Sequence, residues 1–407
     1  MALIVQKYGG SSVADAEKVK RVAKHIVGNK RKNNELVVVV SAPGEMTDDL
    51  LDMAKKITDN RSDREIDMLL STGEQVSIAL LAMAIHEQGE QAISFTGHQV
   101  GIVTDTTHTK AKIISINEKK VFNALEKGNI VIIAGFQGVD EHNDITTLGR
   151  GGSDTTAVAL AAVLKADLCE IYTDVDGVYT ADPRIVPNAQ KIDTISYDEM
   201  LEMASLGAKV MQSRSIEFAK KYDVDVQVRS SFNTNTIGTL ITKEVLSMEK
   251  VVVRGVTCEM DEAKLSLIGV PDRPGVAAKI FTSLAKVNVG VDMIVQSTGE
   301  DGINTISFTV NKSDLKKTME ILNKVAIEIE AKKILADEHI AKISIVGVGM
   351  RSHCGIAASM FEALALNKIN IDMISTSEIK LSCIVEDLRA HEAVRILHDR
   401  FNLADIK

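Results

Sequence analysis

Cysteine is scarce in this sequence, and its spacing suits no structural role. The 407 residues include four cysteines, Cys169, Cys258, Cys354 and Cys383, with no CxxC pair among them. This spacing indicates neither a zinc cluster nor a disulfide framework. A reducing compartment fits such cysteine usage best, so we expect a cytoplasmic protein.

Long apolar runs and a surplus of positive charge are also missing. The runs at 36–40 (LVVVV) and 79–85 (ALLAMAI) are too short to span a bilayer, and Lys7 interrupts any signal-like stretch at the start. Lysine and arginine number 47 against 56 aspartates and glutamates, a formal net charge of -9. Because the apolar runs are short, we expect no membrane partner. Because counterion release needs excess cations, we expect no nucleic-acid partner. This total leaves room for a local basic patch.

Two common kinase signatures are absent as well. The pattern G-x-x-x-x-G-K-[ST] does not occur, and neither does the H-R-D and D-F-G set of protein kinases. The P-loop and protein-kinase classes therefore lose support.

Length and composition indicate a folded protein with more than one domain. Apolar residues make up 45% of the chain and charged residues 25%, both close to ordinary globular usage. Single hydrophobic cores rarely grow beyond roughly 250 residues, so a chain of 407 residues implies two or three domains.

The first part of the chain alternates strand and helix patterns. Helical spacing occurs between most of the apolar runs, as at 19–27. Continuous apolar strands joined by helices predict an α/β domain with a mostly parallel sheet between helical layers. The strand candidates are 3–8, 36–42, 91–95, 129–136, 168–175 and 224–230.

A repeat follows a polar stretch near 243–250. Segment 264–294 aligns with 342–374, including K-x-S-x-x-G-V, a helix opened by glycine and a final D-M-I. Each copy predicts a ferredoxin-like βαββαβ unit, and the second copy indicates duplication. We therefore predict three domains, 1–243, 250–334 and 335–407.

Two glycine-rich segments at helix starts contain candidate site residues. The first, 7–12 (KYGGSS), gathers backbone N–H groups, two hydroxyls and an ammonium after a strand, as in an anion-binding loop. The second, 150–154 (RGGSD), opens an alanine-rich helix. Taken alone, Lys7 could be an exposed lysine in a tight turn and Asp154 a helix cap. Together the segments predict two phosphate-contacting surfaces that face one site.

A third segment, 172–184 (YTDVDGVYTADPR), follows a predicted strand. Loops at the carboxyl ends of parallel strands commonly bind ligands. Asp174 and Asp182 suit a nucleotide ribose or a hydrated Mg²⁺, and Arg184 suits the phosphates. As a bare pattern, a turn-rich loop fits equally well.

Seven motifs occur in order along the chain. They are 7–12 (KYGGSS), 40–51 (VSAPGEMTDDLL), 71–77 (STGEQVS), 134–138 (AGFQG), 146–157 (TTLGRGGSDTTA), 172–184 and 207–215 (GAKVMQSRS). In this order they resemble the aspartate kinases of the amino-acid kinase superfamily, and the repeat resembles the paired ACT domains that regulate them. The resemblance covers essentially the whole chain. It departs at 210–215, where the family often has a His-Pro pair after the valine.

The resemblance implies transfer of the ATP γ-phosphoryl, with Mg²⁺, to the side-chain carboxylate of L-aspartate, the first step of lysine, threonine and methionine biosynthesis. Lys7 would stabilise the transferred phosphoryl and Asp154 would orient Lys7. ATP-binding positions would be Lys7, Gly9, Gly10, Ser11, Thr173, Asp174, Tyr179, Asp182, Arg184 and Lys209. Substrate-binding positions would be Ser41, Thr47, Glu74, Arg150, Gly151, Gly152 and Ser153. No protein side chain is predicted as a metal ligand.

Arg150 and Glu74 suit the two ends of an amino acid, but Glu74 and Lys209 also have ordinary structural explanations. Arg150 offers a planar fork for the α-carboxylate of aspartate, and Glu74 an anion for its ammonium. Glu74 could instead be a first-turn acid of a helix over 74–85 that favours the helix dipole, and Lys209 a solvated helix charge.

The paired units predict amino-acid regulation. In the first copy, Asp272, Gly275 and Ala277 at a helix start suit an effector carboxylate, and Asp292 and Gln296 suit its ammonium and side chain. The second copy lacks the Asp-Arg-Pro run, so its pocket is expected to be altered or empty. His353 and Cys354 there fit structural roles better than metal binding.

The family resemblance also suggests how the chain assembles. It implies lysine and threonine as candidate inhibitors, effector sites at a dimer interface between ACT units, and homodimers or higher oligomers. A separate small subunit starting at Met248 would contain the repeat alone. The sequence leaves open which amino acid inhibits, whether inhibition is concerted and how many subunits assemble.

Two other functions fit parts of the pattern. A sister kinase for acetylglutamate, glutamate or a nucleoside monophosphate would share the fold, but the combination of Glu74, Arg150 and paired ACT units disfavours it. A catalytically silent amino-acid sensor would be expected to lose Lys7 or Asp154, and both are present.

Overall fold

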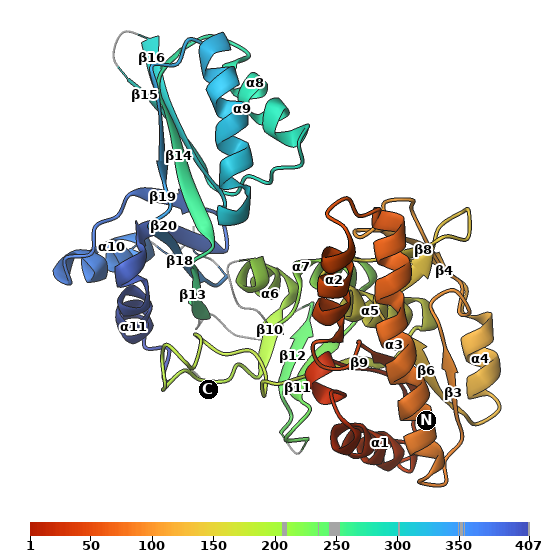
Figure 1. The fold of residues 1–407 in the computed structure, drawn as a ribbon. Coiled ribbons are helices and arrows are strands. Elements are labelled where there is room, and N and C mark those ends of the chain that lie inside the picture. Colours follow the sequence, from red (N-terminus) through yellow and green to blue (C-terminus); the bar gives the residue numbers. More distant parts are fainter. Residues whose placement is uncertain are drawn as a thin grey trace.

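The computed structural model describes residues 1–205, 210–234, 236–243, 253–299, 302–348, 350, 353 and 355–405. A large N-terminal α/β domain is followed by two smaller units built from the repeat, and the second unit adjoins the N-terminal domain (Figure 1). Lys209, Met248 and Cys354 lie outside the described residues.

An eight-stranded sheet forms the centre of the N-terminal domain. Its order is β10-β12-β11-β9-β1-β2-β6-β3. The strands from β11 to β3 are parallel, whereas β12 is antiparallel to β11 and parallel to β10. The prediction of a mostly parallel sheet is therefore confirmed. The bounds are β1 (Leu3–Tyr8), β2 (Glu35–Val40), β3 (Ala92–Phe95), β6 (Ile130–Ala134), β9 (Leu168–Thr173), β10 (Thr194–Ser196), β11 (Val226–Ser230) and β12 (Thr239–Thr242).

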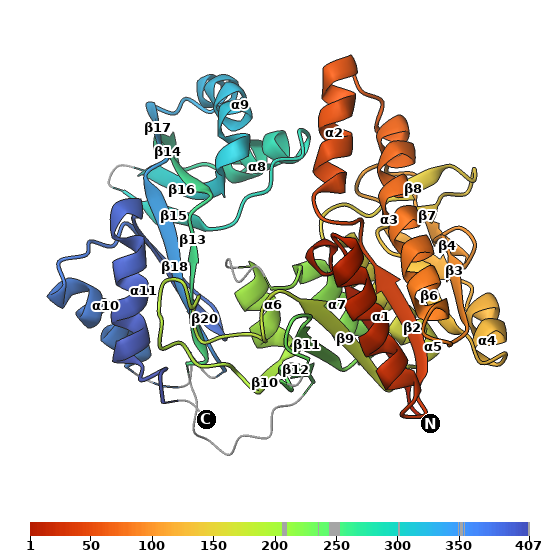
Figure 2. The same cartoon turned by 60° about the horizontal axis from the view of Figure 1, so that its bottom comes forward.

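Helices cover both faces of this sheet (Figure 2). They are α1 (Ala16–Lys30), α2 (Met46–Ile57), α3 (Asp63–His86), α4 (Lys119–Leu125), α5 (Gly152–Leu164), α6 (Tyr197–Ser205) and α7 (Ser213–Tyr222). In β2, Val38 belongs to the core shared with α1 and α3, and Val39 to the core shared with α5 and α7. Burial on both faces explains why the strand sequence is continuously apolar.

Helix α3 begins eleven residues before Glu74, at Asp63, and ends at His86. Glu74 therefore lies in the middle of the helix, so the alternative that it is a first-turn acid is wrong. In length and composition α3 could cross a membrane, but half of its most apolar window is buried in the fold. Ile78, Leu81 and Ile85 pack in the core with α1, as is typical of a core helix.

A second, smaller sheet covers one end of the N-terminal domain. Its order is β5-β4-β7-β8, from β4 (Ile102–Thr104), β5 (Ile113–Ile116), β7 (Gln137–Val139) and β8 (Ile145–Thr147). These strands are three or four residues long, too short for a clear period in the sequence.

Each C-terminal unit is a four-stranded antiparallel sheet with two helices. The first sheet has the order β15-β16-β14-β17 and the second β13-β18-β20-β19. The strand bounds are β13 (Gly255–Glu259), β14 (Glu262–Pro271), β15 (Ile294–Thr298), β16 (Ile303–Asn311), β17 (Lys333–Asp337), β18 (Ile340–Val346), β19 (Met373–Thr376) and β20 (Lys380–Glu386). The helices are α8 (Val276–Ala285), α9 (Leu315–Glu328), α10 (Ile356–Leu366) and α11 (Ala390–Arg400).

The strand pairing does not follow the predicted boundaries of these units. Strand β13 precedes the first repeat copy but pairs with β18 of the second. The expected division after residue 334 also falls inside β17, which pairs with β14. Each sheet needs a fourth strand, and the second copy obtains it from upstream in the chain. We therefore propose a first unit of 262–337 and a second unit of 253–259 with 340–405.

Two ion pairs that are related by the repeat join the C-terminal units. Lys264 of the first copy pairs with Asp372 of the second, and Lys342 of the second pairs with Asp292 of the first. Each lysine occupies the K-x-S position of its copy, and each aspartate the D-M-I position. Only Lys342, whose side chain is 2% exposed, also contacts a second acid, Glu262.

The segment after β9 packs into the second C-terminal unit. Ala181 and Val186 belong to the hydrophobic core of that unit. The Val256 N–H donates to the Thr180 carbonyl at 2.7 Å, and the Thr180 hydroxyl lies 3.0 Å from Nε2 of the fully buried His398 on α11. A loop of the N-terminal domain is thus packed into the second C-terminal unit.

Candidate active site

Lys7 and Asp154 form an ion pair at the carboxyl edge of the main sheet. Nζ of Lys7, on β1, lies 2.6 Å from Oδ1 of Asp154 in the first turn of α5. The two side chains are only 12% and 10% exposed. Asp154 does not cap the helix, because the N-cap is Gly151. The alternative of an exposed Lys7 in a simple turn is wrong.

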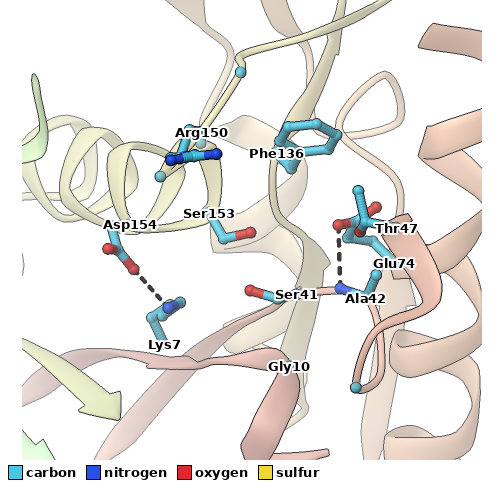
Figure 3. Close-up of a pocket in the computed structure, with 14 residues that line it drawn as sticks. Lys7, Gly10, Ser41, Ala42, Thr47, Glu74, Phe136, Arg150, Ser153 and Asp154 are labelled. Carbon is cyan, nitrogen blue, oxygen red and sulfur yellow. Dashed lines mark hydrogen bonds and ion pairs between the residues drawn. The ribbon is translucent and has the colours of Figure 1, made fainter. Parts of the chain in front are cut away.

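Both glycine-rich segments line one cavity of about 300 Å³ (Figure 3). Gly10 comes from the loop after β1, and Gly151 and Gly152 come from the start of α5. Close packing requires glycine at Gly10, since a Cβ there would lie 2.7 Å from the Ala42 carbonyl oxygen. Gly151 has φ +71°, a left-handed conformation that glycine adopts without strain. The two predicted phosphate-contacting surfaces therefore face the same cavity.

Glu74 is a buried carboxylate on the opposite side of this cavity. It is 3% exposed, and its Oε1 accepts a 3.1 Å hydrogen bond from the Ala42 N–H. Its buried Oε2 has no partner among the described residues. Burial raises the pKa of Glu74 to about 7, against the lowering effect of backbone hydrogen bonds. Such a carboxylate lacks a cation or donor that a ligand could supply.

The remaining predicted substrate residues complete the cavity. Ser41 and Thr47 follow β2, Ser153 lies in the first turn of α5, and exposed Arg150 precedes it. Figure 3 shows Lys7 and Asp154 on one side of the cavity and Glu74 and Thr47 on the other.

Four lining residues were not predicted: Ala42, Gly44, Phe136 and Gly149. Phe136 has φ +68° between β6 and β7, and its N–H donates to the Thr156 hydroxyl at 3.1 Å. Phe136 could have been predicted to line the cavity, because it lies in the 134–138 motif.

Of the described residues predicted to bind ATP, Lys7 and Gly10 line this cavity and the others do not. Thr173 ends β9, directly beside β1, and the Gly9 N–H approaches the Tyr172 carbonyl at 3.4 Å. Oδ1 of Asp174 accepts a hydrogen bond from the Thr173 hydroxyl. Asp182 pairs with Arg184 at 2.6 Å, which lowers the pKa of Asp182. The backbone of Tyr179 forms an isolated antiparallel β-bridge with that of Lys191.

The predicted effector residues do not gather in one protomer. The Asp272 N–H bonds to the Gly302 carbonyl, and the Asp292 N–H bonds to the Thr309 carbonyl, at opposite ends of β16. At about 3.3 Å per residue these positions are roughly 20 Å apart. Asp292 already holds the Lys342 ammonium, while Gly275 (φ +94°) and Ala277 lie at the start of α8 and Gln296 is exposed on edge strand β15. A single pocket from all five residues is therefore not formed within one chain.

Comparison with known proteins agrees with this architecture. Residues 2–230 match the amino acid kinase family, and residues 265–325 and 343–401 each match the ACT domain. An aspartate kinase of Pseudomonas putida is 54% identical over 404 residues, covering 99% of this chain and 98% of the relative. An aspartokinase of Mycolicibacterium smegmatis is 51% identical over 408 residues, covering 99% and 97%.

The chain belongs to the aspartate kinases of the amino acid kinase family. The family predicted from the seven motifs is confirmed. Among solved aspartate kinases, Escherichia coli aspartokinase III in complex with aspartate and ADP (R-state) has a TM-score of 0.83 at 25% identity, covering 98% of this chain and 99% of that one. The same enzyme in complex with lysine and aspartate (T-state) has a TM-score of 0.78 at 26% identity, with the same coverage.

Proposed function

We propose that this aspartate kinase transfers the γ-phosphoryl of ATP to L-aspartate in the cavity between the two glycine-rich segments, giving 4-phospho-L-aspartate and ADP. One observation supports this assignment above all others. A buried ammonium paired to Asp154 and a buried carboxylate with an unpartnered oxygen line the same small cavity. An amino acid with its own carboxylate and ammonium complements these two groups.

The chemistry needs charge neutralisation more than proton transfer. A substrate carboxylate with an ordinary pKa of about 3.9 is already ionised at pH 7, so it needs no general base. Its approach to a triphosphate is opposed by repulsion, and the transition state spreads charge over the equatorial oxygens. Lys7 and the N–H groups near Gly10 and Gly152 supply fixed positive potential at that point. Asp154 holds the Lys7 ammonium in place.

The substrate aspartate would be oriented through its α-ammonium and α-carboxylate groups. Glu74 Oε2 accepts the α-ammonium, and the Arg150 guanidinium binds the α-carboxylate as a planar fork. Ser41, Thr47 and Ser153 provide further hydroxyl contacts, and Phe136 adds an apolar wall. The side-chain carboxylate then points toward Lys7.

ATP would lie along the carboxyl edge of the sheet, with its adenosine near the segment after β9. Gly9, Gly10 and Ser11 contact the phosphates, while Thr173, Asp174, Tyr179, Asp182 and Arg184, with Lys209, form the remainder of the nucleotide site. Among the described residues, no three His, Cys, Asp or Glu side chains form a metal site. Mg²⁺ needs only one or two protein carboxylates beside the phosphates, and Asp174 fits this need. When bound, the metal neutralises charge on the phosphate oxygens.

Regulation is proposed to work through the ACT units, with lysine, threonine or both as effectors. A site that combines Asp272, Gly275 and Ala277 with Asp292 and Gln296 would need a second chain, so we expect at least a homodimer. We also expect the enzyme to work in the cytoplasm. A small subunit starting at Met248 stays a prediction. Turnover measured with lysine, threonine and methionine, singly and together, will identify the effector and any concerted inhibition.

The reaction is tested by assaying ADP release with aspartate, glutamate, N-acetylglutamate and nucleoside monophosphates. We expect turnover with aspartate alone. Replacing Lys7 by alanine should lower kcat for aspartyl hydroxamate formation at least about 100-fold, because a transition-state donor is lost. Lys20→Ala removes an exposed lysine of α1 and should leave kcat unchanged. Near-normal turnover in Lys7→Ala would overturn the proposed mechanism.

A further inference from the structure

A second cavity lies on the opposite face of β1 from α5. Its volume is about 390 Å³, and its lining includes Arg21, Lys24 and Lys32 with Arg229 from β11. The loop residues Ser231 and Phe232 also contribute to it. Asp154 and the glycine-rich segments do not line it, so it is separate from the active site.

The charge in this cavity is strongly one-sided. Four of its lining residues are lysine or arginine, and none is aspartate or glutamate. This cluster occurs in a chain with a net charge of -9. His25 adds no positive charge near neutral pH, because burial lowers its pKa.

Most of these cations lack an acidic partner in the described part of the chain. Among the described residues, no ion pair involves Lys24, Lys32 or Arg21, and the Arg21 guanidinium lies over the Phe232 ring, 4.8 Å from its centroid. Arg229 is the exception, since it pairs with Glu170 at 2.7 Å. Subtracting that pair leaves three uncompensated positive charges around one cavity.

Two buried donors in the same place are also unsatisfied. The Ser231 hydroxyl, on a residue that is 3% exposed, has no hydrogen-bond partner among the described residues. Nε of Arg229 is likewise buried without an acceptor. Buried polar groups are normally paired, so two orphaned donors beside unpaired cations indicate a missing acceptor.

We propose that this cavity binds a small phosphorylated anion, with Arg21, Lys24 and Lys32 neutralising its charge and the Ser231 hydroxyl donating to a phosphate oxygen. Three excess positive charges suit a multiply charged phosphate better than a single carboxylate. The three cations are exposed at an open cavity of about 390 Å³, a volume that suits a metabolite-sized molecule. Neither site depends on the other for its assignment, so this proposal does not rest on the proposed reaction.

The ligand would contact β1 on the face away from α5, close to β9. Tyr8 lines the cavity and follows Lys7 directly in β1. Its ring stacks on Tyr172, with the centroids 4.7 Å apart, and Tyr172 precedes Thr173 of the proposed nucleotide site. The second cavity and the proposed ATP site therefore lie on opposite faces of β1 and β9.

Inorganic pyrophosphate is the probe for this site, titrated calorimetrically into the full chain in phosphate-free buffer. Because the active site can also attract pyrophosphate, the titration uses the Lys7→Ala background. We expect Lys24→Ala combined with Lys32→Ala to weaken binding at least about tenfold. The matched control is Lys20→Ala with Lys30→Ala, which removes two lysines of α1, the helix that contains Lys24, and neither of them lines the cavity.

The control should bind pyrophosphate as the Lys7→Ala background does. Three of the four substitutions place alanine, a strong helix former, in α1, and Lys32 lies in the turn after it, so the helix is expected to persist. Equal loss in both double variants would mean that only general charge attracts the anion, and would overturn the proposal. Absence of pyrophosphate binding in the Lys7→Ala background at millimolar concentration would overturn it as well. Neither result would affect the assay of aspartate phosphorylation.

Discussion

At the scale of single residues, burial gives Glu74 its chemical character. The carboxylate lies in the middle of α3, where the sequence favours a helix but says nothing of solvent. Packing against Ala42 removes water from Oε1, and Oε2 has no partner in the described structure. The cost of burying an unpaired charge raises the pKa of Glu74 to about 7.

Aspartate binding should therefore weaken as the pH falls below about 7, because protonated Glu74 cannot accept the α-ammonium as an ion pair. The KM for aspartate should rise by about tenfold per pH unit from pH 6.5 downward, while the KM for ATP changes little. Steady-state kinetics between pH 5.5 and pH 8.5 measure this.

The control for this pH profile is Glu74→Gln, which cannot titrate. It should show a high KM for aspartate at every pH, with the slope lost. If Glu74→Gln kept the same pH dependence, another group would be responsible.

At the scale of elements, the active site depends on backbone segments that approach closely. The loop after β1 touches the loop after β2, where the Gly44 N–H donates to the Gly10 carbonyl at 3.0 Å. Gly73 allows α3 to pack against Ala42 in the same way, since a Cβ at 73 would lie 2.7 Å from the Ala42 Cβ. Small residues at these contacts bring Lys7 and Glu74 into one cavity.

Replacing Gly10 by alanine should disturb this contact. Its Cβ would lie 2.7 Å from the Ala42 carbonyl oxygen, so one of the two loops must shift. We expect the free energy of unfolding to fall by about 1–3 kcal/mol. The kcat should fall as well, and both quantities are measured by urea denaturation and turnover.

Gly28→Ala is the matched control, since nothing lies within 4 Å of the Cβ that it adds in helix α1. It should raise the free energy of unfolding by roughly 0.5–1 kcal/mol and leave kcat unchanged, because glycine is a poor residue for a helix interior. Similar effects from the two alanines would contradict the packing argument.

At the scale of the whole molecule, the proposed nucleotide segment is part of the regulatory fold. Thr180 lies between Tyr179 and Ala181, and both its carbonyl and its hydroxyl bond to the second C-terminal unit. A rearrangement of that unit must move or release this segment. This contact offers a direct physical connection from effector binding to ATP binding.

His398 is accordingly expected to position the nucleotide segment through Thr180. His398→Ala should raise the KM for ATP about fivefold, the worth of roughly one hydrogen bond, and leave the KM for aspartate unchanged. His398→Gln can place an amide near the position of Nε2 and should restore much of the ATP affinity. Equal changes in both KM values would indicate general damage to the fold instead.

The pairs between the C-terminal units should differ greatly in strength. Lys342→Met leaves buried Glu262 and the partly exposed Asp292 without their cation, which should cost about 3–5 kcal/mol. Lys264→Met leaves only Asp372, whose side chain is 43% exposed, and no buried acid, so it should cost about 1 kcal/mol or less. Urea denaturation of the two variants compares these losses, and equal losses would contradict the special role of Lys342.

The sequence by itself determined six of the eight strands of the main sheet, the C-terminal repeat and the identity of the site segments. The apolar runs at 3–8 and 168–175 became β1 and β9, and the second glycine-rich segment begins α5 as predicted. The first does not begin an α-helix directly, because α1 starts at Ala16 with Asp15 as its N-cap. These features depend on local periodicity and on the backbone freedom of glycine, and both are written in neighbouring residues. The seven motifs likewise identified the family before any distance was known.

Only the tertiary structure decided which distant groups meet and how deeply they are buried. It showed the contact between Lys7 and Asp154 that only the family resemblance had implied, left Glu74 Oε2 without a partner among the described residues and separated Asp272 from Asp292. It also gave β13 to the second C-terminal sheet. Strand order and solvent exclusion arise from packing between segments far apart in the chain. No local pattern specifies them, and they set the charges that act in the site.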